Sequence, residues 1–333
     1  MFLRKSLATL LGALMVLACL TAAGNASAGE EITLGSLAPK KSPWGKVFNA
    51  WAKAVKKKSD GALKLTWYFN GAQGDDKAMV AKIRAGQLDG AAINSVGLSA
   101  IHKDILALQM PGLCTTWECL DKVRDAMTPR FQANMNKEGF VFVGVGDVGL
   151  ARTMSKGKGI KTPKDLKNMK VYAWQDDITY PTVTSVVGYT PVLSSVPGLL
   201  PALSSGRINV ITVPCLAATQ LQWWSHLDHI NSQVAGIGIG GLVISKSRFD
   251  GLPGDLRELF AKTGKKAGKM LTKRIRKEDA KAYKMIASRM TVVKMNPAQK
   301  ARWKSIFKKI RKQLGQGTFP AELVNKLNTL AGH

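Results

Sequence analysis

Residues 63–95 read LKLTWYFNGAQGDDKAMVAKIRAGQLDGAAINS, and they contain a strand, a helix and a second strand in succession. Residues 63–69 alternate apolar and polar side chains, which predicts a strand with one buried face. After a glycine-containing loop, a helix is predicted over 75–85 that ends at Gly86. Residues 88–93 form a short apolar run, typical of a buried strand. The stretch therefore predicts a β-α-β unit.

The same alternation of strands and helices extends to both sides of this unit. Before it, a strand over 31–37 precedes a helix that begins at Pro43, with Ser42 as its N-cap. After it, a helical stretch over 117–136 leads into a strand over 140–145. This order predicts the α/β fold class, with a mainly parallel sheet covered by helices on both faces.

A second series of the same kind follows a change of composition at residues 146–151. The series comprises strands over 170–174, 190–193 and 210–213 and helices over 177–187 and 197–204. Two series predict a two-lobed fold with the ligand cleft between the lobes, at the carboxyl ends of the strands. The glycine-rich segment 236–241 is interpreted as tight turns or hinge backbone.

A helical pattern over 256–290 is long enough to link both lobes, with a break possible near Gly264 or Gly268. From this layout we expect two lobes joined by hinge strands and a long helix. Lobe I is predicted to comprise residues 29–150 and about 240–282, and lobe II residues 151–239 and about 283–333.

The chain begins with the pattern of a cleavable signal peptide over residues 1–28. Basic residues precede the apolar run 7–20, and small residues follow up to Ala28. We expect export to the periplasm. A lipoprotein cleavage site at Cys19 is the less favoured alternative, because the residues before it fit a lipidation signal poorly.

The 333 residues include 49 Lys and Arg against 22 Asp and Glu, a formal charge of +27. The excess is greatest between Lys262 and Lys312, where 19 basic residues stand against Glu278 and Asp279. Few aromatic residues are interleaved with them, which argues against nucleic acid as a partner. We expect a solvated basic face, and weak contact of this C-terminal region with an anionic membrane surface is the alternative.

Three cysteines follow the predicted signal peptide. Cys114 and Cys119 could form a local disulfide or stay reduced, because the Cα separation that a bridge requires cannot be read from sequence. No histidine has a ligand-like spacing with a cysteine, and Asp176 with Asp177 is the weak remaining candidate for a metal. Helix capping is the favoured role of this pair and of Asp75. We predict no metal and no cofactor.

Catalytic motifs are missing from the sequence. There is no Gly-x-Ser-x-Gly, no His-Glu-x-x-His, no Gly-x-x-x-x-Gly-Lys-Ser/Thr and no dinucleotide fingerprint after the first strand. Aromatic residues are more informative, since Tyr172 and Trp174 lie two apart at the end of a predicted strand and therefore share one face. These features favour a binding protein over an exported enzyme.

Four segments resemble the DctP-type substrate-binding subunits of TRAP transporters, which deliver small solutes, mostly organic acids, to a membrane permease. The segments are 71–79, GAQGDDKAM; 86–90, GQLDG; 162–171, TPKDLKNMKV; and 200–210, LPALSSGRINV. The resemblance covers nearly the whole mature chain. It implies two α/β lobes that close on a solute without converting it, with the permease subunits as partners. A periplasmic sensor, or a carrier of lipid-like molecules without such a permease, is the alternative.

At two positions the sequence departs from that family. The family's carboxylate-binding arginine falls on Tyr172, and a family asparagine falls on Val213 before Pro214. These replacements imply a solute with more apolar or aromatic character than the usual acids. Arg152 lies near another family arginine and is predicted as the one cationic anchor for a carboxylate. The complete predicted site is Trp44, Gln73, Asn94, Ser95, Arg152, Tyr172, Trp174, Val213, Pro214 and Trp223.

Overall fold

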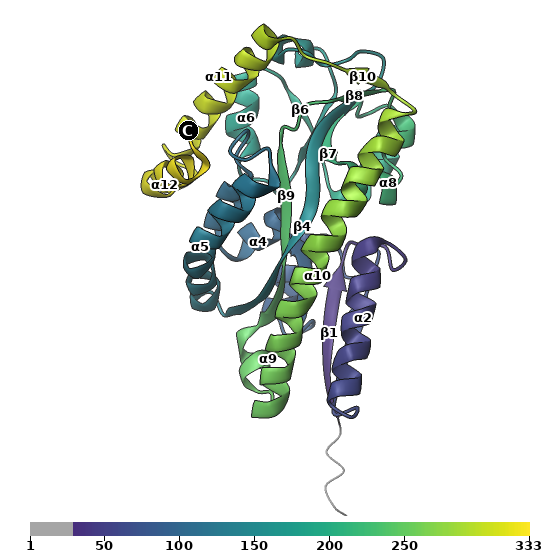
Figure 1. Ribbon diagram of the computed structural model, residues 1–333, viewed down its shortest axis with the longest axis vertical. Helices are drawn as coiled ribbons and strands as arrows, with labels where there is room; N and C mark the ends of the chain where they lie inside the picture. Colours follow the sequence, from purple (N-terminus) through teal and green to yellow (C-terminus); the bar gives the residue numbers. More distant parts are fainter. Residues whose placement is uncertain (1–28) are drawn as a thin grey trace, which may run out of the picture.

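The computed structural model describes residues 29–333, so the predicted signal peptide and the alternative site at Cys19 lie outside the described residues. Strands of this part of the chain form one ten-stranded sheet in the order β2-β1-β3-β9-β4-β7-β5-β6, and β8 joins β10 to β4. The α/β fold class is confirmed, and the molecule has two lobes (Figure 1). We call the end built around β1, β2 and β3 the first lobe, and the end built around β5, β6 and β7 the second lobe.

The first lobe contains the β-α-β unit predicted over residues 63–95. Its elements are β1 (Glu30–Ser36), α2 (Pro43–Lys58), β2 (Leu63–Tyr68), α3 (Asp76–Arg84), β3 (Gly90–Asn94), α4 (Ser95–Ile101) and α5 (Trp117–Lys137). The strands β2 and β3 are not neighbours, because β1 lies between them and pairs with both in parallel. The predicted caps are confirmed: Ser42 Oγ accepts a hydrogen bond from Gly45 N at 3.2 Å, and Asp75 caps α3.

The second lobe follows the predicted series closely. Its elements are β5 (Val171–Trp174), α6 (Tyr180–Val187), β6 (Pro191–Ser194), α7 (Val196–Ser204), β7 (Val210–Pro214), α8 (Cys215–Gln220) and β8 (His229–Asn231). The strand β5 pairs in parallel with β6 and β7. Helix α6 begins three residues later than predicted, because Asp177 forms a local turn by accepting hydrogen bonds from the backbone and side chain of Thr179. The capping role predicted for the Asp176-Asp177 pair is therefore wrong, since the N-cap of α6 is Thr179.

Two long antiparallel strands connect the lobes. They are β4 (Phe140–Ser155) and β9 (Gly236–Ser245), and their register places Val145 opposite Gly241 and Gly146 opposite Gly240. Residues 236–241 do not form tight turns, since the segment is extended and paired, and their alternative interpretation as hinge backbone stays a prediction. The predicted strand at 140–145 is too short. The observed strand β4 continues to Ser155, through the expected lobe boundary at residues 150 and 151. The predicted boundaries of the two lobes stay a prediction.

Helix α10 (Gly254–Ala287) runs unbroken along β4 from one lobe to the other (Figure 1). The break considered near Gly264 or Gly268 is therefore wrong. Both glycines are buried on the side of α10 that packs on the sheet, and a Cβ atom on Gly268 would lie 2.6 Å from the Val145 carbonyl oxygen. The two glycines thus let the helix approach the strand backbone closely, and they do not interrupt it.

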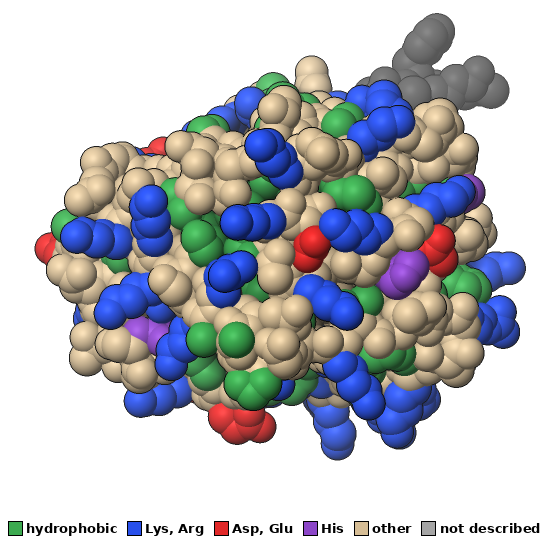
Figure 2. Space-filling view, turned by 90° about the horizontal axis from the view of Figure 1, so that it is seen from above, with side chains coloured by type: hydrophobic (Ala, Val, Ile, Leu, Met, Phe, Trp, Pro, Cys, Tyr) green, Lys and Arg blue, Asp and Glu red, His purple; other side chains and the backbone are tan. Residues whose placement is uncertain are grey.

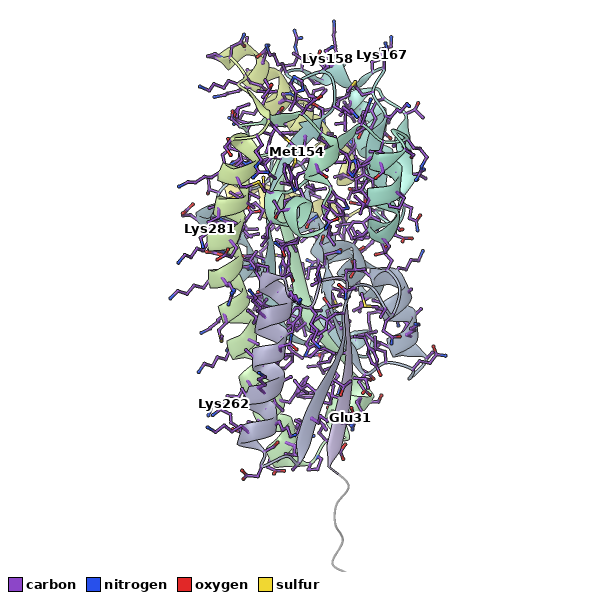
Figure 3. The ribbon with its side chains drawn as sticks, turned by 90° about the vertical axis from the view of Figure 1, so that its right-hand side faces the viewer. Glu31, Met154, Lys158, Lys167, Lys262 and Lys281 are labelled. Carbon is purple, nitrogen blue, oxygen red and sulfur yellow. A yellow bond between two sulfur atoms is a disulfide. The ribbon has the colours of Figure 1, made fainter. Side chains whose placement is uncertain are left out.

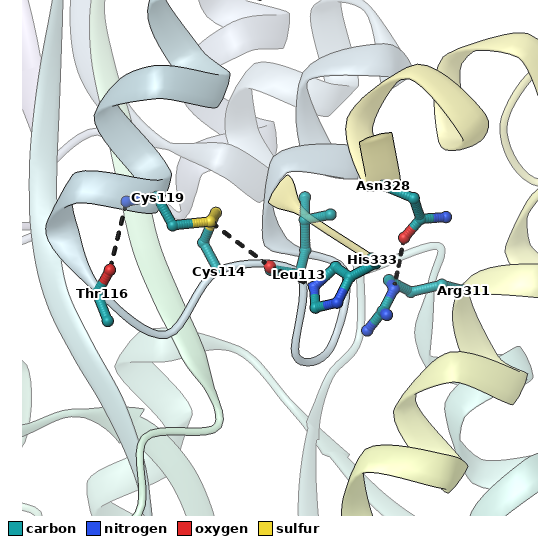
Figure 4. Close-up of a disulfide and its surroundings, with 7 residues drawn as sticks. All are labelled: Leu113, Cys114, Thr116, Cys119, Arg311, Asn328 and His333. Carbon is teal, nitrogen blue, oxygen red and sulfur yellow. Dashed lines mark hydrogen bonds between the residues drawn. A yellow bond between two sulfur atoms is a disulfide. The ribbon is translucent and has the colours of Figure 1, made fainter. Parts of the chain in front are cut away.

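A short helix, α9 (Lys246–Asp250), precedes α10. After α10 follow β10 (Thr291–Val293), α11 (Pro297–Leu314) and α12 (Ala321–Ala331). Cys114 and Cys119 form a disulfide across the start of α5, with a Cα separation of 5.5 Å (Figure 4). This resolves the alternatives that the sequence left open. Close by, the His333 ring nitrogen Nε2 lies 2.8 Å from the Leu113 carbonyl oxygen, which ties the end of the chain to this region.

Basic side chains cover much of the surface. Lys262 and Lys281 project from the outer side of α10, and Lys158 and Lys167 project at the far end of the second lobe (Figure 3). Seen from that end, Lys and Arg side chains are spread over the face with few acidic ones among them (Figure 2). No helix among residues 29–333 is long and apolar enough to cross a membrane.

Candidate functional site

A cavity of about 400 Å³ lies between the two lobes. The first lobe contributes residues such as Trp44 and Asn94 to its wall, and the second lobe contributes Tyr172 and Trp223. The volume is in the range of small-molecule binding sites. The cavity therefore lies where the two series of strands predicted the cleft.

Eight of the ten predicted site residues line this cavity. They are Trp44, Asn94, Ser95, Tyr172, Trp174, Val213, Pro214 and Trp223. Tyr172 and Trp174 share one face of β5, as their spacing predicted, and Trp44 on α2 donates a hydrogen bond from Nε1 to the Asp147 carbonyl oxygen at 3.4 Å. The fold thus brings these side chains together, and their contact with a solute stays a prediction.

Arg152 is not among the residues that line the cavity. Its side chain is held elsewhere, since its guanidinium lies 3.9 Å from the ring centroid of Tyr283 and donates to the Ser232 carbonyl oxygen. The structure does not place Arg152 where a carboxylate anchor in the cavity would have to be.

Gln73 also lies outside the cavity lining. Its side-chain oxygen accepts a hydrogen bond of 2.9 Å from Lys82 Nζ. Gln73 thus connects the loop before α3 to a residue of that helix. This contact gives Gln73 a local structural role.

Asp76 lines the cavity and was missed as a site residue. It is the first residue of α3, is 1% exposed, and accepts a hydrogen bond from Asn94 Nδ2 through Oδ2. Burial, followed by the charge of Asp75, raises the pKa of Asp76 well above its ordinary value of 3.8. One carboxylate is enough to cap α3. The second acid of the Asp75-Asp76 pair is not needed for capping, and this could have marked Asp76 as a site residue.

Three polar atoms at the cavity have no hydrogen-bond partner within residues 29–333. They are Asp76 Oδ1, Tyr172 Oη and Trp174 Nε1. Burial also raises the pKa of the Tyr172 hydroxyl, and nearby carboxylates, first among them that of Asp75, raise it further. Buried polar groups in proteins are nearly always satisfied, so a water molecule or a ligand is needed to complete these three atoms.

Within residues 29–333, the cavity wall is built without a cationic side chain. Among the described residues that line it, none is a lysine, an arginine or a histidine, and the acidic ones are Asp76, Asp147 and Asp177. Asp147 is neutralised by salt bridges with Arg124 and Arg276, at 2.5 and 2.7 Å. The remaining polar groups in the wall can therefore form hydrogen bonds with a solute, but they offer no positive charge.

Two contacts join the lobes beside the cavity. Asp75 Oδ2 in the first lobe accepts a hydrogen bond of 3.3 Å from Val196 N at the start of α7. Lys77 Nζ forms a salt bridge of 3.2 Å with Asp176 of the second lobe. Both acids of the Asp176-Asp177 pair are thus engaged with protein groups, Asp176 with Lys77 and Asp177 with Thr179.

A sequence model of the DctP family, described as bacterial extracellular solute-binding protein, family 7, matches residues 34–316. An uncharacterized protein of Haemophilus influenzae is 22% identical over 217 residues, which cover 64% of this chain and 65% of that protein. The uncharacterized protein YiiZ of Salmonella typhimurium is 24% identical over 199 residues, 59% of this chain and 60% of YiiZ. The chain thus matches less than two thirds of the length of either relative.

Solved structures share the fold at low identity. The sugar acid binding protein DctPAm of Advenella mimigardefordensis, in complex with galactonate, matches 91% of this chain and 98% of its own, with a TM-score of 0.85 and 17% identity. A TRAP periplasmic solute-binding protein of Shewanella oneidensis with bound succinate matches 91% and 100%, with a TM-score of 0.85 and 15% identity. The Bordetella pertussis receptor DctP7, which binds pyroglutamic acid, matches 92% and 100%, with a TM-score of 0.83 and 17% identity.

Proposed function

Because the chain belongs to the DctP family, the bacterial extracellular solute-binding proteins of family 7, we propose that it is the solute-binding subunit of a TRAP-type transporter. In this role it captures a small organic solute of apolar or aromatic character in the periplasm. It then releases the solute, chemically unchanged, to the membrane permease. The family consists of binding proteins for solute transport, and no catalytic step is part of the proposal.

The lining of the cavity is the observation that supports this proposal. Aromatic side chains from both lobes, such as Trp44, Tyr172 and Trp223, form its wall together with aliphatic ones such as Val213. Burial of apolar surface is the main source of affinity that such a wall can offer. A solute that contacts both lobes also binds the closed arrangement better than an open one, and so it drives closure.

The expected carboxylate group of the solute has no support from this lining. The solved relatives named above bind galactonate, succinate and pyroglutamic acid. A carboxylate in the present cavity would meet no cationic side chain among the described residues. Burying an unpaired charge is costly. We therefore propose a solute of apolar character and do not propose a carboxylate group.

For the basic C-terminal region, weak contact with an anionic membrane surface is proposed as the alternative to a solvated face. Its lysines, such as Lys262 and Lys281, project from the outer side of α10 (Figure 3) and do not line the cavity. Contact with anionic lipid headgroups, or with the permease, is a proposal that rests on this charge alone.

A cavity-filling substitution tests whether the solute binds in this cavity. We expect a bound solute at 100 times its Kd to stabilise the protein by about 2.7 kcal/mol and to raise Tm by several degrees. Ala217→Trp fills the wall of the cavity, so this increase is expected to disappear, whereas Ala298→Trp on exposed α11 is expected to retain it. A thermal-shift screen of aromatic acids, short fatty acids, dicarboxylates and amines measures this. Solute binding that survives Ala217→Trp, or a response to dicarboxylates alone, would contradict the proposal.

A further inference from the structure

We propose that the solute is uncharged, and that a carbonyl-type oxygen of it accepts hydrogen bonds from Asp76, Tyr172 and Trp174. The inference rests on the proposed function, because it specifies the class of solute that the same cavity takes. Three features of the cavity support it: the hydrogen-bond donors in the wall, the charges around them, and the match of these donors to an uncharged acceptor.

The three side chains present unpaired atoms in buried positions. Asp76 is 1% exposed and Tyr172 is 5% exposed, and Asp76 Oδ1 and Tyr172 Oη have no partner within the described chain. Trp174 Nε1 is also buried without a hydrogen-bond partner, and it lies near Asp75, whose pKa is raised by burial while the indole N–H opposes that rise. An indole N–H can only donate, and a phenol hydroxyl can donate. Two of the three groups are thus available as donors.

The third group, Asp76, becomes a donor when its carboxyl group is neutral. It is fully buried beside Asp75, and no cationic side chain among residues 29–333 lines the cavity. The charge of Asp75 acts on Asp76 itself, and the charges of Asp75, Asp177 and Asp176 act on the neighbouring Tyr172. Lys77 is engaged by Asp176. Because Asp76 Oδ2 accepts from Asn94, the proton of the neutral acid resides on Oδ1, the unpaired oxygen.

A neutral carbonyl oxygen completes this set. A carboxylate would bring an uncompensated charge next to Asp75 and Asp177. An ammonium group cannot accept a hydrogen bond from Trp174 Nε1 or from the Asp76 hydroxyl. A carbonyl oxygen of an amide, ester or ketone is uncharged and can accept hydrogen bonds from converging donors. The apolar part of the solute then packs against side chains such as Val213 and Trp223.

Matched compounds that differ only in the polar group test this class directly. The probes are phenylacetamide, phenylacetate and phenethylamine; indole-3-acetamide, indole-3-acetate and tryptamine; and hexanamide, hexanoate and hexylamine. Titration calorimetry of the full mature protein is expected to show at least about tenfold tighter binding of the amide than of its acid and amine in the series that binds best. The heat of amide binding is also expected to be the same in buffers of different ionisation enthalpy, because no proton is exchanged.

The donors are tested by variants. Tyr172→Phe and Asp76→Leu are each expected to weaken amide binding about fivefold, because each removes one donor to the carbonyl oxygen. Tyr68→Phe, at an exposed position outside the cavity, is the matched control and is expected to leave binding unchanged. Tighter binding of the acid or of the amine than of the amide, or unchanged binding by both cavity variants, overturns the inference. If no compound binds, the proposed function itself fails.

The neutral state of Asp76 has a separate readout in the folded protein without solute. Because the folded pKa of Asp76 is raised above 3.8, the folded state binds more protons between these two pH values. The stability that this group contributes is complete below about pH 3.8 and is lost as pH rises through the folded pKa. We therefore expect wild type to lose stability relative to Asp76→Asn as pH rises over that interval. A difference between the two proteins that does not change with pH shows an ordinary, ionised Asp76 and overturns the inference.

Discussion

Replacement of Asp147 by alanine is expected to lower the free energy of unfolding by about 3–5 kcal/mol. Asp147 on β4 is buried, and its two carboxylate oxygens bind Arg124 on α5 at 2.5 Å and Arg276 on α10 at 2.7 Å. Arg124 is itself buried, so the alanine variant leaves its charge without the main compensating partner. The carboxylate also links α5 and α10 to β4, a strand that connects the lobes.

Asp121→Ala is the matched control for this prediction, and denaturation by urea is the measurement. Asp121 binds the same two arginines, but its side chain is 40% exposed to solvent. Removal of an exposed partner is expected to cost about 1 kcal/mol or less, because water replaces it and Asp147 still compensates the arginines. Equal losses in the two variants would contradict the assignment of the stabilising charge to Asp147.

Gly149→Ala is expected to lower the free energy of unfolding by about 2–4 kcal/mol. Gly149 has a φ angle of +143°, a conformation that residues with a Cβ atom rarely adopt. A Cβ atom there would lie 2.5 Å from Asp279 Oδ1 and 2.7 Å from Pro214 Cβ. It would displace the buried Asp279 carboxylate, which accepts hydrogen bonds from Leu150 N at 2.9 Å and Leu216 N at 2.8 Å.

A glycine three residues earlier on β4 provides the control for this substitution. A Cβ atom on Gly146 would meet Leu271 Cδ1 at 3.6 Å, an ordinary contact, and Gly146 has no positive φ angle. Gly146→Ala is therefore expected to change the stability by less than about 1 kcal/mol. Thermal and urea denaturation of both variants measure the difference. Similar stabilities of the two variants would contradict the prediction, because they would show that β4 tolerates a side chain at Gly149.

Local signals made much of the fold predictable. The capping residues Ser42 and Asp75 fixed the starts of α2 and α3, because their side chains satisfy free backbone N–H groups. The order of strands in space was not predictable from the β-α-β unit alone. The strand β1 lies between β2 and β3, and which strands pair is decided by contacts far apart in sequence.

The two connecting strands were the hardest elements to predict. Glycine is unfavourable in strands and usually marks turns, so the run from Gly236 to Gly241 favoured an irregular segment. In the fold, the run pairs with β4, and a Cβ atom on Gly240 would lie 2.7 Å from the Ile93 carbonyl oxygen. The requirement for glycine thus comes from close packing between strands, which the local sequence does not show.

The candidate site was predictable only in part. The aromatic residues Tyr172 and Trp174 were found because their spacing of two places them on one face of a strand. Arg152 was proposed from an alignment uncertain by one residue, and its contacts with Tyr283 and Ser232, far away in sequence, could not be predicted locally. Asp76 was missed because its burial depends on packing against Asn94.

A crystal structure of the protein with the compound that raises Tm most tests the central claim directly. The account predicts one solute molecule in the cavity between the lobes, with its apolar part against Trp223 and Val213 and an oxygen within hydrogen-bond distance of Tyr172 Oη and Asp76 Oδ1. A solute bound outside this cavity, or one whose carboxylate pairs with Arg152, would contradict it.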